Sequence, residues 1–267
     1  MTDGQSIKAD LEKIRAGRPL VHNITNYVVM NTTANALLAL GASPVMAHAV
    51  EEVEEMAGLA AALVLNIGTL SGPWIEAMKI AARAARKKGI PIILDPVGAG
   101  ATRFRTAVAL ELLVAARPAI VRGNASEIRA LAAAGGETRG VESRHGAEEA
   151  LEAARELAAR YGSIISISGA VDLIVGTERT ARVRNGHPMM ACVTGMGCAA
   201  SALTGAFLAV NPSPLRAAAH AMAVMGIAGE MAAERSAGPG SLQVNFLDAL
   251  YALSENDIQS RLRMEWI

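Results

Sequence analysis

The sequence contains few residues of the kinds that mark disulfide-rich, zinc-binding or nucleic-acid-binding proteins. Only two of its 267 residues are cysteine, Cys192 and Cys198, which are too few for a disulfide framework or a complete metal site. The 25 basic and 25 acidic residues balance, and no basic run is longer than Arg86 to Lys88. We therefore expect a small-molecule partner and no nucleic acid.

The sequence also lacks a segment that we would interpret as a secretion signal or a membrane span. Met1 is followed by polar and charged residues, which predicts a cytoplasmic protein. The 28 residues from Pro188 to Leu215 carry no charge and exceed the roughly 20 residues that a spanning helix needs. Glycine and proline divide this stretch, so the helical part from Gly197 to Val210 would rise only about 21 Å. We expect a buried core helix there and no membrane partner.

Apolar residues, by contrast, are abundant. They make up 52% of the chain, enough to fill a large core, and we expect a single domain spanning residues 1–267. Six short β-rich runs lead into helical patterns, and such alternation predicts an α/β fold with a mainly parallel central sheet. The runs are continuously apolar, which indicates that helices cover both faces of the sheet. They are residues 20–24, 44–46, 63–67, 91–94, 119–121 and 164–167.

Helical patterns fill the intervals, as at residues 71–88 and 148–161, where glycine follows the last helical position. After Ile174 the pattern changes to short extended pieces, and Asn185-Gly186 is a strong hairpin signal. From Gly197 to the end the chain is expected to be almost all helical.

Ligands of open α/β sheets collect beyond the carboxyl ends of the strands, so the residues after each expected strand are the first candidates for a site. These positions hold amides, two acids, one arginine and several glycines. They are Asn23, Asn26, Met46, residues 66–69, residues 95–100, residues 122–124 with Glu127, Ser168, Gly169 and residues 194–198.

The turn Thr194–Cys198 precedes an apolar helix, and its glycines would let free backbone N–H groups and the helix dipole approach a phosphate. Small residues could instead merely permit close packing there. Gly195, Gly197 and Ala200 also satisfy the dinucleotide pattern G-x-G-x-x-A. That pattern belongs in a first βαβ unit with an acid about 20 residues on, whereas the next acid here is Glu230.

Asp95, Arg122 and Glu127 together supply what phosphoryl transfer needs: carboxylates for Mg²⁺ and a cation for phosphate oxygens. Taken one at a time, these residues could have a purely structural role. Asp95 could cap its own turn, and Glu127 could form a capping box with Asn124. Their joint presence at one sheet edge favours a magnesium-dependent phosphoryl-transfer site.

Cys198 could be a small buried core residue, the usual state of a free cysteine. At a helix N-terminus, however, we expect its pKa to be lowered, which would let the thiolate accept a proton from a substrate hydroxyl. Cys192 is expected to lie in a strand before the turn and to belong to the core.

Six segments carry a family resemblance. They are VHNITN at 21–26, GASPVM at 41–46, NIGTL at 66–70, DPVGAGA at 95–101, RGNASEI at 122–128 and TGMGC at 194–198. With these, the chain closely resembles the hydroxyethylthiazole kinase family of the ribokinase-like superfamily over nearly its full length. The resemblance implies Mg²⁺-dependent transfer of the γ-phosphoryl group of ATP to 4-methyl-5-(2-hydroxyethyl)thiazole in thiamine salvage, in a homotrimer with substrate pockets at subunit interfaces.

The resemblance also implies roles for particular residues. The ATP-binding set is Arg122, Ser168, Thr194 and Gly197. The thiazole-binding set is Asn26, Met46 and Gly195. The magnesium-side acids are Asp95 and Glu127, and Cys198 matches the position where much of the superfamily has an aspartate base. Ser168 and Met196 look like mild variants of a commoner Thr and a commoner Ala or Thr.

Three other readings stay open from the residues. The nearest is another ribokinase-like activity, either a hydroxymethylpyrimidine kinase or an ATP-dependent dehydratase. A thiazole or nucleotide sensor without turnover and a dinucleotide oxidoreductase are the others.

Overall fold

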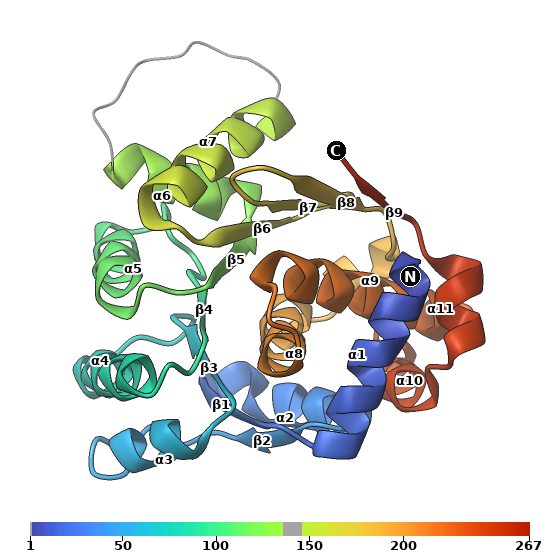
Figure 1. The fold of residues 1–267 in the computed structure, drawn as a ribbon, viewed down its shortest axis with the longest axis horizontal. Helices are drawn as coiled ribbons and strands as arrows, with labels where there is room; N and C mark the ends of the chain where they lie inside the picture. Colours follow the sequence, from blue (N-terminus) through green and yellow to red (C-terminus); the bar gives the residue numbers. More distant parts are fainter. Residues whose placement is uncertain (1, 136–145) are drawn as a thin grey trace.

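A nine-stranded sheet runs through the computed structural model, which describes residues 2–135 and 146–267 (Figure 1). In spatial order the strands are β2 (Ser43–Val45), β1 (Leu20–Ile24), β3 (Ala62–Asn66), β4 (Ile92–Asp95), β5 (Ile120–Asn124), β6 (Ile164–Ser168), β7 (Asp172–Val175), β8 (Thr180–Val183) and β9 (Met264–Trp266). Strands β2 to β6 pair in parallel, and β7 to β9 pair antiparallel. The expected mainly parallel sheet is confirmed, with strand boundaries shifted by a few residues.

Helices cover both faces of this sheet, as the continuously apolar strands indicated (Figure 1). On one face α2 (Met30–Leu40), α8 (Met196–Val210) and α9 (Pro214–Ala233) contact the strands. Beyond them α1 (Asp3–Gly17), α10 (Pro239–Ala252) and α11 (Glu255–Arg261) pack on these helices and complete the same core. The other face packs against α3 (Val53–Leu59), α4 (Gly72–Lys87), α5 (Arg103–Ala116), α6 (Ala125–Gly135) and α7 (Gly146–Tyr161). Two 3₁₀ helices, η1 (Tyr27–Val29) and η2 (Pro188–Cys192), lie in connections.

Helix α8 forms the centre of the first face, and its uncharged sequence is explained by burial. Gly205 lies against the sheet so closely that a Cβ atom there would be 3.0 Å from side-chain carbons of both Val21 and Val64. Helix α8 therefore packs directly on β1 and β3, and its N-terminus is carried to the carboxyl edge of the strands. No helix within residues 2–135 and 146–267 combines the length and the hydropathy that a membrane crossing requires.

The hairpin expected at Asn185-Gly186 is wrong. The antiparallel turn joins β7 to β8 earlier, where Gly176 N–H donates to the Arg179 carbonyl at 2.9 Å. Asn185 and Gly186 instead leave the sheet, because a distant acid, Glu230, accepts hydrogen bonds from the Asn185 side chain and the Gly186 N–H. These long-range bonds override a turn preference that is only local.

The expectation for Cys192 is also wrong. Cys192 is exposed and ends η2, a 3₁₀ helix that begins at Pro188, so it lies neither in a strand nor in the core. The almost all-helical part expected from Gly197 onward is confirmed by α8 to α11. Its exception is β9, which pairs with β8, and Ile267 N–H donates to the Thr180 carbonyl at 2.8 Å.

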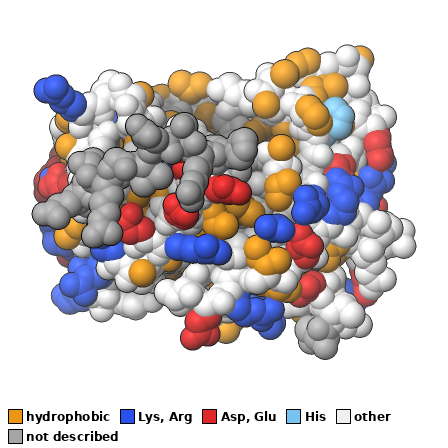
Figure 2. All heavy atoms as spheres, turned by 90° about the horizontal axis from the view of Figure 1, so that it is seen from above, with side chains coloured by type: hydrophobic (Ala, Val, Ile, Leu, Met, Phe, Trp, Pro, Cys, Tyr) orange, Lys and Arg blue, Asp and Glu red, His pale blue; other side chains and the backbone are white. Residues whose placement is uncertain are grey.

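Figure 2 shows one face of the molecule from above. Basic and acidic side chains are interspersed among the described residues on this face, with hydrophobic side chains between them. This face therefore carries no single block of one charge.

Candidate functional site

A buried carboxylate lies at the carboxyl edge of the parallel strands. Asn66 ends β3 and Asp95 ends β4, and the strand register places them side by side. Asn66 Nδ2 donates to Asp95 Oδ2 at 2.8 Å, and the Ser201 hydroxyl of α8 donates to the same oxygen at 2.6 Å. Asp95 is only 3% exposed. Two neighbouring strands and the central helix thus hold one acid in place.

Burial raises the pKa of Asp95 to about 6. The positive charge of Arg122 and the hydrogen bonds from Ser201 and Asn66 oppose this effect, while the negative charge of Glu127 adds to it. Ionisation of Asp95 is therefore unfavourable in the protein without a bound cation. A nearby cation would favour its ionised form.

Asn26 links this acid to the cysteine of the turn. Asn26 Nδ2 lies 3.4 Å from Asn66 Oδ1 and 3.4 Å from Cys198 Sγ. The expectation of a lowered Cys198 pKa is wrong: burial, followed by the negative charge of Asp95, raises the pKa of the thiol to about 11. The hydrogen bonds with Asn66 and Asn26 and the charge of Arg122 lower the pKa by less, so Cys198 is a neutral thiol at pH 7.

The turn before α8 requires glycine at one position. Gly195 is the N-cap of α8 with a φ of 84°, and a Cβ atom there would lie 2.6 Å from Val29 Cγ1. A Cβ atom at Gly197 would lie 3.6 Å from an Arg122 guanidinium nitrogen, so the start of α8 lies beside this cation. The first N–H groups of a helix have no partner within it. Backbone donors and a cation therefore converge here.

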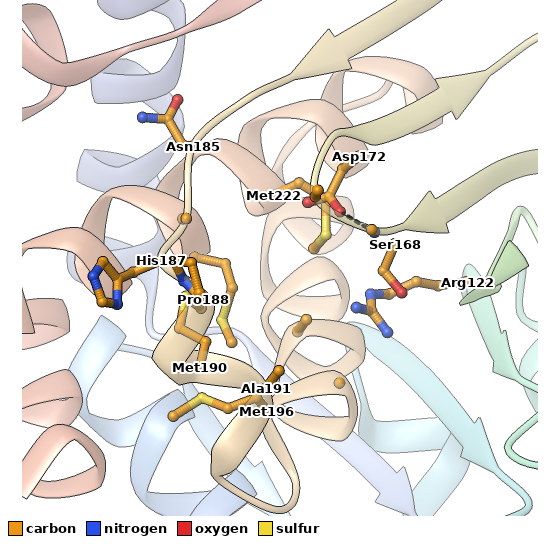
Figure 3. A pocket seen from close by; sticks show the side chains of 17 residues that line it. Arg122, Ser168, Asp172, Asn185, His187, Pro188, Met190, Ala191, Met196 and Met222 are labelled. Carbon is orange, nitrogen blue, oxygen red and sulfur yellow. Dashed lines mark hydrogen bonds between the residues drawn. The ribbon is translucent and has the colours of Figure 1, made fainter. Parts of the chain in front are cut away.

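A cavity of about 570 Å³ opens beside the start of α8. Three of the residues expected to bind ATP line it, Arg122, Ser168 and Gly197, whereas Thr194 is exposed and does not. In Figure 3 the Arg122 and Ser168 side chains lie together on one side, and Pro188 and Met190 face them from the other. Arg122 is 6% exposed, and its Nε has no hydrogen-bond partner among the described residues.

Much of the cavity wall could not be recognised in the sequence. Met222 and Met225 of α9 are buried in the core and also line the cavity. Met190 of η2 and Asp172 at the start of β7 line it as well. Asp172 accepts a hydrogen bond from Gly169 N–H at 2.9 Å, and burial raises its pKa. No motif marked these residues, because they converge only through the packing of α9 and η2.

Glu127 has the structural role that the sequence left open. Its two carboxylate oxygens accept from Gly98 N–H and Asn124 N–H, both at 2.8 Å, and Asn124 Oδ1 accepts from Glu127 N–H at 3.0 Å. This is a capping box that also holds the glycine loop after β4.

Arg105 of α5 fixes the same loop from the other side, and sequence reasoning missed it. Its guanidinium donates to the carbonyls of Ile67, Gly68 and Val97 at 2.8 to 2.9 Å. The connections after β3 and β4 are therefore tied together beside Asp95. An arginine in a helix gives no signal of this role in the sequence.

Met46 lies apart from the cavity. It follows β2 at the end of the strand order, and its carbonyl lies 3.1 Å from His48 Nδ1. The His48 ring stacks on Trp74 with centroids 4.0 Å apart, and Tyr27 lies 4.7 Å from Trp74. These rings bring the Met46 loop towards Tyr27, the neighbour of Asn26 in the chain. Within the described part of the chain, no contact joins Met46 to Arg122.

Comparison with known proteins gives consistent results. A model described as the hydroxyethylthiazole kinase family matches residues 11–256. Hydroxyethylthiazole kinase from Syntrophus aciditrophicus is 63% identical over 96% of this chain and 95% of its own. That from Nitratidesulfovibrio vulgaris (strain Miyazaki F) is 53% identical over 99% of both.

Solved structures agree with these sequence matches. The hydroxyethylthiazole kinase protein of Pyrococcus horikoshii superposes with a TM-score of 0.92 at 48% identity, covering 98% of this chain and 99% of that one. A pyridoxal kinase from Staphylococcus aureus in complex with AMP-PCP and pyridoxal superposes with a TM-score of 0.64 at 16% identity, over 93% and 98% of the chains, which concerns the fold alone. The fold is ribokinase-like, and the chain belongs to the hydroxyethylthiazole kinase family of phosphotransferases.

Proposed function

We propose that this protein transfers the γ-phosphoryl group of ATP to the hydroxyl of 4-methyl-5-(2-hydroxyethyl)thiazole, with Mg²⁺ as cofactor. One observation carries the proposal: consecutive residues at the start of α8 belong to two sides of one site. Gly197 lines the cavity, and Cys198 contacts Asn26 on the side of the Asp95 carboxylate. A nucleotide in the cavity would thus have its phosphates at the helix N-terminus, next to an acceptor alcohol.

The cavity suits ATP in its charge as well as its position. Arg122 offers a buried guanidinium whose Nε has no partner among the described residues, and the Ser168 hydroxyl lies on the same side. Four methionines, Met190, Met196, Met222 and Met225, give part of the cavity an apolar lining, as expected for the part that receives a base. We assign Arg122, Ser168, Gly197 and the preceding Thr194 to the nucleotide.

The carboxylates fit a magnesium ion. Asp95 Oδ2 accepts two hydrogen bonds, whereas Oδ1 accepts none from the described residues and is free for a cation. Glu127 adds negative charge nearby, but both of its oxygens already hold backbone N–H groups, which favours a contact through water. Mg²⁺ commonly takes one or two carboxylates and keeps several waters. A bound Mg²⁺ would neutralise negative charge on the phosphate groups.

We assign the thiazole to the opposite side of the turn, to Asn26, Met46 and Gly195. Tyr27 and Val28 beside Asn26 are 61% and 72% exposed, which is unusual for large apolar side chains next to a buried polar network. A neighbouring subunit covering them would complete the thiazole pocket. This supports the homotrimer with sites at subunit interfaces that the resemblance implies.

In the proposed mechanism the thiazole hydroxyl attacks the γ-phosphorus in line with the leaving ADP. Arg122 and the N–H groups from Gly195 to Cys198 stabilise the charge on the phosphoryl oxygens, and positioning supplies most of the acceleration. Cys198 is placed to receive the hydroxyl proton. Only the thiolate form could accept this proton, and at pH 7 the raised pKa leaves that form as a small fraction of the molecules. Where Cys198 is the neutral thiol, the hydroxyl proton would pass instead to a phosphoryl oxygen of the product or to water.

The test is ADP release measured with and without the hydroxyethylthiazole, in Mg²⁺ and in EDTA. Thiazole-dependent, magnesium-dependent release supports the proposal. The same assay with hydroxymethylpyrimidine in place of the thiazole tests the closest rival: ADP release with the pyrimidine and not with the thiazole would indicate a hydroxymethylpyrimidine kinase. Tight thiazole binding without ADP release would indicate a sensor.

A further inference from the structure

A partly buried glutamate outside the cavity is bonded to the cavity wall. Glu230 lies on α9, and its side chain is 12% exposed. Its Oε1 atom accepts hydrogen bonds from Asn185 Nδ2 at 3.0 Å, Gly186 N–H at 2.8 Å and the Arg263 guanidinium at 2.6 Å. One carboxylate oxygen therefore joins three segments that are far apart in the sequence.

Two of these partners belong to the wall itself. Asn185 and Gly186 line the cavity, followed by His187 and Pro188, and Figure 3 shows Asn185 and His187 at its margin. The wall segment also lies close to α9: a Cβ atom at Gly226 would be 2.6 Å from Asn185. The position of residues 185–188 against α9 thus depends on bonds that Glu230 makes.

The third partner comes from the end of the chain. Arg263 N–H donates to Asn185 Oδ1 at 2.8 Å, and the Arg261 carbonyl accepts from Asn185 Nδ2 at 2.8 Å. The Asn185 amide is therefore bonded to both α9 and the segment that leads into β9. Neither Glu230 nor Arg263 lines the cavity, so both would act on it only through the wall.

We propose that Glu230, with Arg263, is a positioning residue for nucleotide binding: it keeps the Asn185–Pro188 wall in the conformation that receives ATP. The inference rests on the proposed function, because it requires the cavity to be the nucleotide site. If the hydrogen bonds to Glu230 are weakened, the wall has the conformation that binds ATP in only a fraction of the molecules. The apparent Kd then rises by the inverse of that fraction.

The chain offers a control at the C-cap of the same helix. Glu234 lies one turn further along and pairs with Arg261 through both oxygens, at 2.6 and 3.1 Å. It too ties the end of α9 to the end of the chain, but among the described residues its side chain bonds only to Arg261, which does not line the cavity. If Glu230 only anchored the C-terminal segment, Glu230→Gln and Glu234→Gln would have similar effects.

The experiment measures binding of the non-hydrolysable analogue AMP-PCP by calorimetry and ATP turnover in the wild type, Glu230→Gln and Glu234→Gln. Glutamine keeps an oxygen that can accept the three hydrogen bonds but lacks the charge that strengthens them, so we expect Glu230→Gln to raise the Kd and the KM for ATP by up to about tenfold. We expect kcat and the KM for the thiazole to stay unchanged within about twofold. Glu234→Gln should bind AMP-PCP as the wild type does. Arg263→Gln, at a side chain that is 51% exposed, provides a second variant that does not endanger folding and should show a smaller shift in the same direction.

Unchanged AMP-PCP binding in both Glu230→Gln and Arg263→Gln would overturn the inference alone. Equal weakening by Glu234→Gln would also overturn it, because a general anchoring role would then suffice. A wild type that binds no AMP-PCP would instead overturn the proposed function, and the inference with it.

Discussion

Replacing Asp95 by asparagine is expected to make the metal-free protein more stable and to abolish its activity. The Asp95 carboxylate is 3% exposed, and one of its oxygens accepts both hydrogen bonds, from Asn66 and Ser201. An asparagine amide oxygen can accept the same two bonds. The substitution therefore removes the charge and retains the surrounding contacts.

The sign follows from the pKa. Burial raises the pKa of Asp95 from 3.8 to about 6, so the folded state binds this proton more tightly than the unfolded state. Ionisation of Asp95 therefore does not affect the free energy of unfolding below pH 3.8. It lowers this free energy increasingly between pH 3.8 and pH 6, and by its full amount above pH 6. The full value is about 3 kcal/mol, or roughly 6 to 12 °C in Tm for a chain of this size.

The assay is thermal unfolding of the wild type and Asp95→Asn in EDTA between pH 4 and pH 8, together with ADP release in Mg²⁺. Asp248→Asn is the control, since Asp248 is exposed on α10. Asp95→Asn should match the wild type in Tm at pH 4 and exceed it at pH 8, while Asp248→Asn stays near the wild type throughout. A Tm difference that does not change with pH would refute the electrostatic reasoning, as would a variant less stable than the wild type at pH 8.

Three further substitutions test other parts of the site and the fold. Gly195→Ala should lower the free energy of unfolding in urea by at least about 1–2 kcal/mol and weaken ATP binding, because φ is 84° and the new methyl group would clash with Val29. Gly17→Ala is the control: it has open space around it and should change neither quantity. Cys198→Ala should lower kcat while the Kd for AMP-PCP stays near normal, and an unchanged kcat would exclude a role as base. Asp10→Asn should lower the free energy of unfolding by about 1 kcal/mol at pH 7. Burial raises the pKa of Asp10, but the hydrogen bonds from a buried imidazole and an amide outweigh burial and lower the pKa, so the difference from the wild type should shrink as the pH falls in an acid-unfolding experiment.

Local sequence patterns predicted the parallel half of the sheet and the chemical groups at its edge. Continuous apolar runs such as that ending at Asp95 are typical of strands covered on both faces, and polar residues that follow parallel strands lie at one edge. The turn from Thr194 to Cys198 was recognised because glycines before an apolar helix let the backbone approach a ligand. In the structure Gly195 has a φ of 84°, a conformation that other residues avoid.

Contacts between distant segments could not be predicted in this way. Ser201 bonds Asp95 only because α8 packs across the sheet, and Arg105 ties two loops only because α5 lies beside them. Neither residue type is unusual in a helix. The cavity wall formed by Met190 and Met222 likewise depends on η2 meeting α9.

The sequence by itself therefore determined which acids, amides and glycines lie at the carboxyl edge of the sheet. Their placement depends on short-range periodicity and backbone conformation, which a local pattern encodes. Only the tertiary structure decided how those groups behave. Burial and the charge of Asp95 turned Cys198 from an expected thiolate into a neutral thiol, and bonds to Glu230 turned Asn185-Gly186 from an expected hairpin into a cavity wall. Desolvation and long-range hydrogen bonding arise from the packing of the whole chain, and no local pattern encodes them.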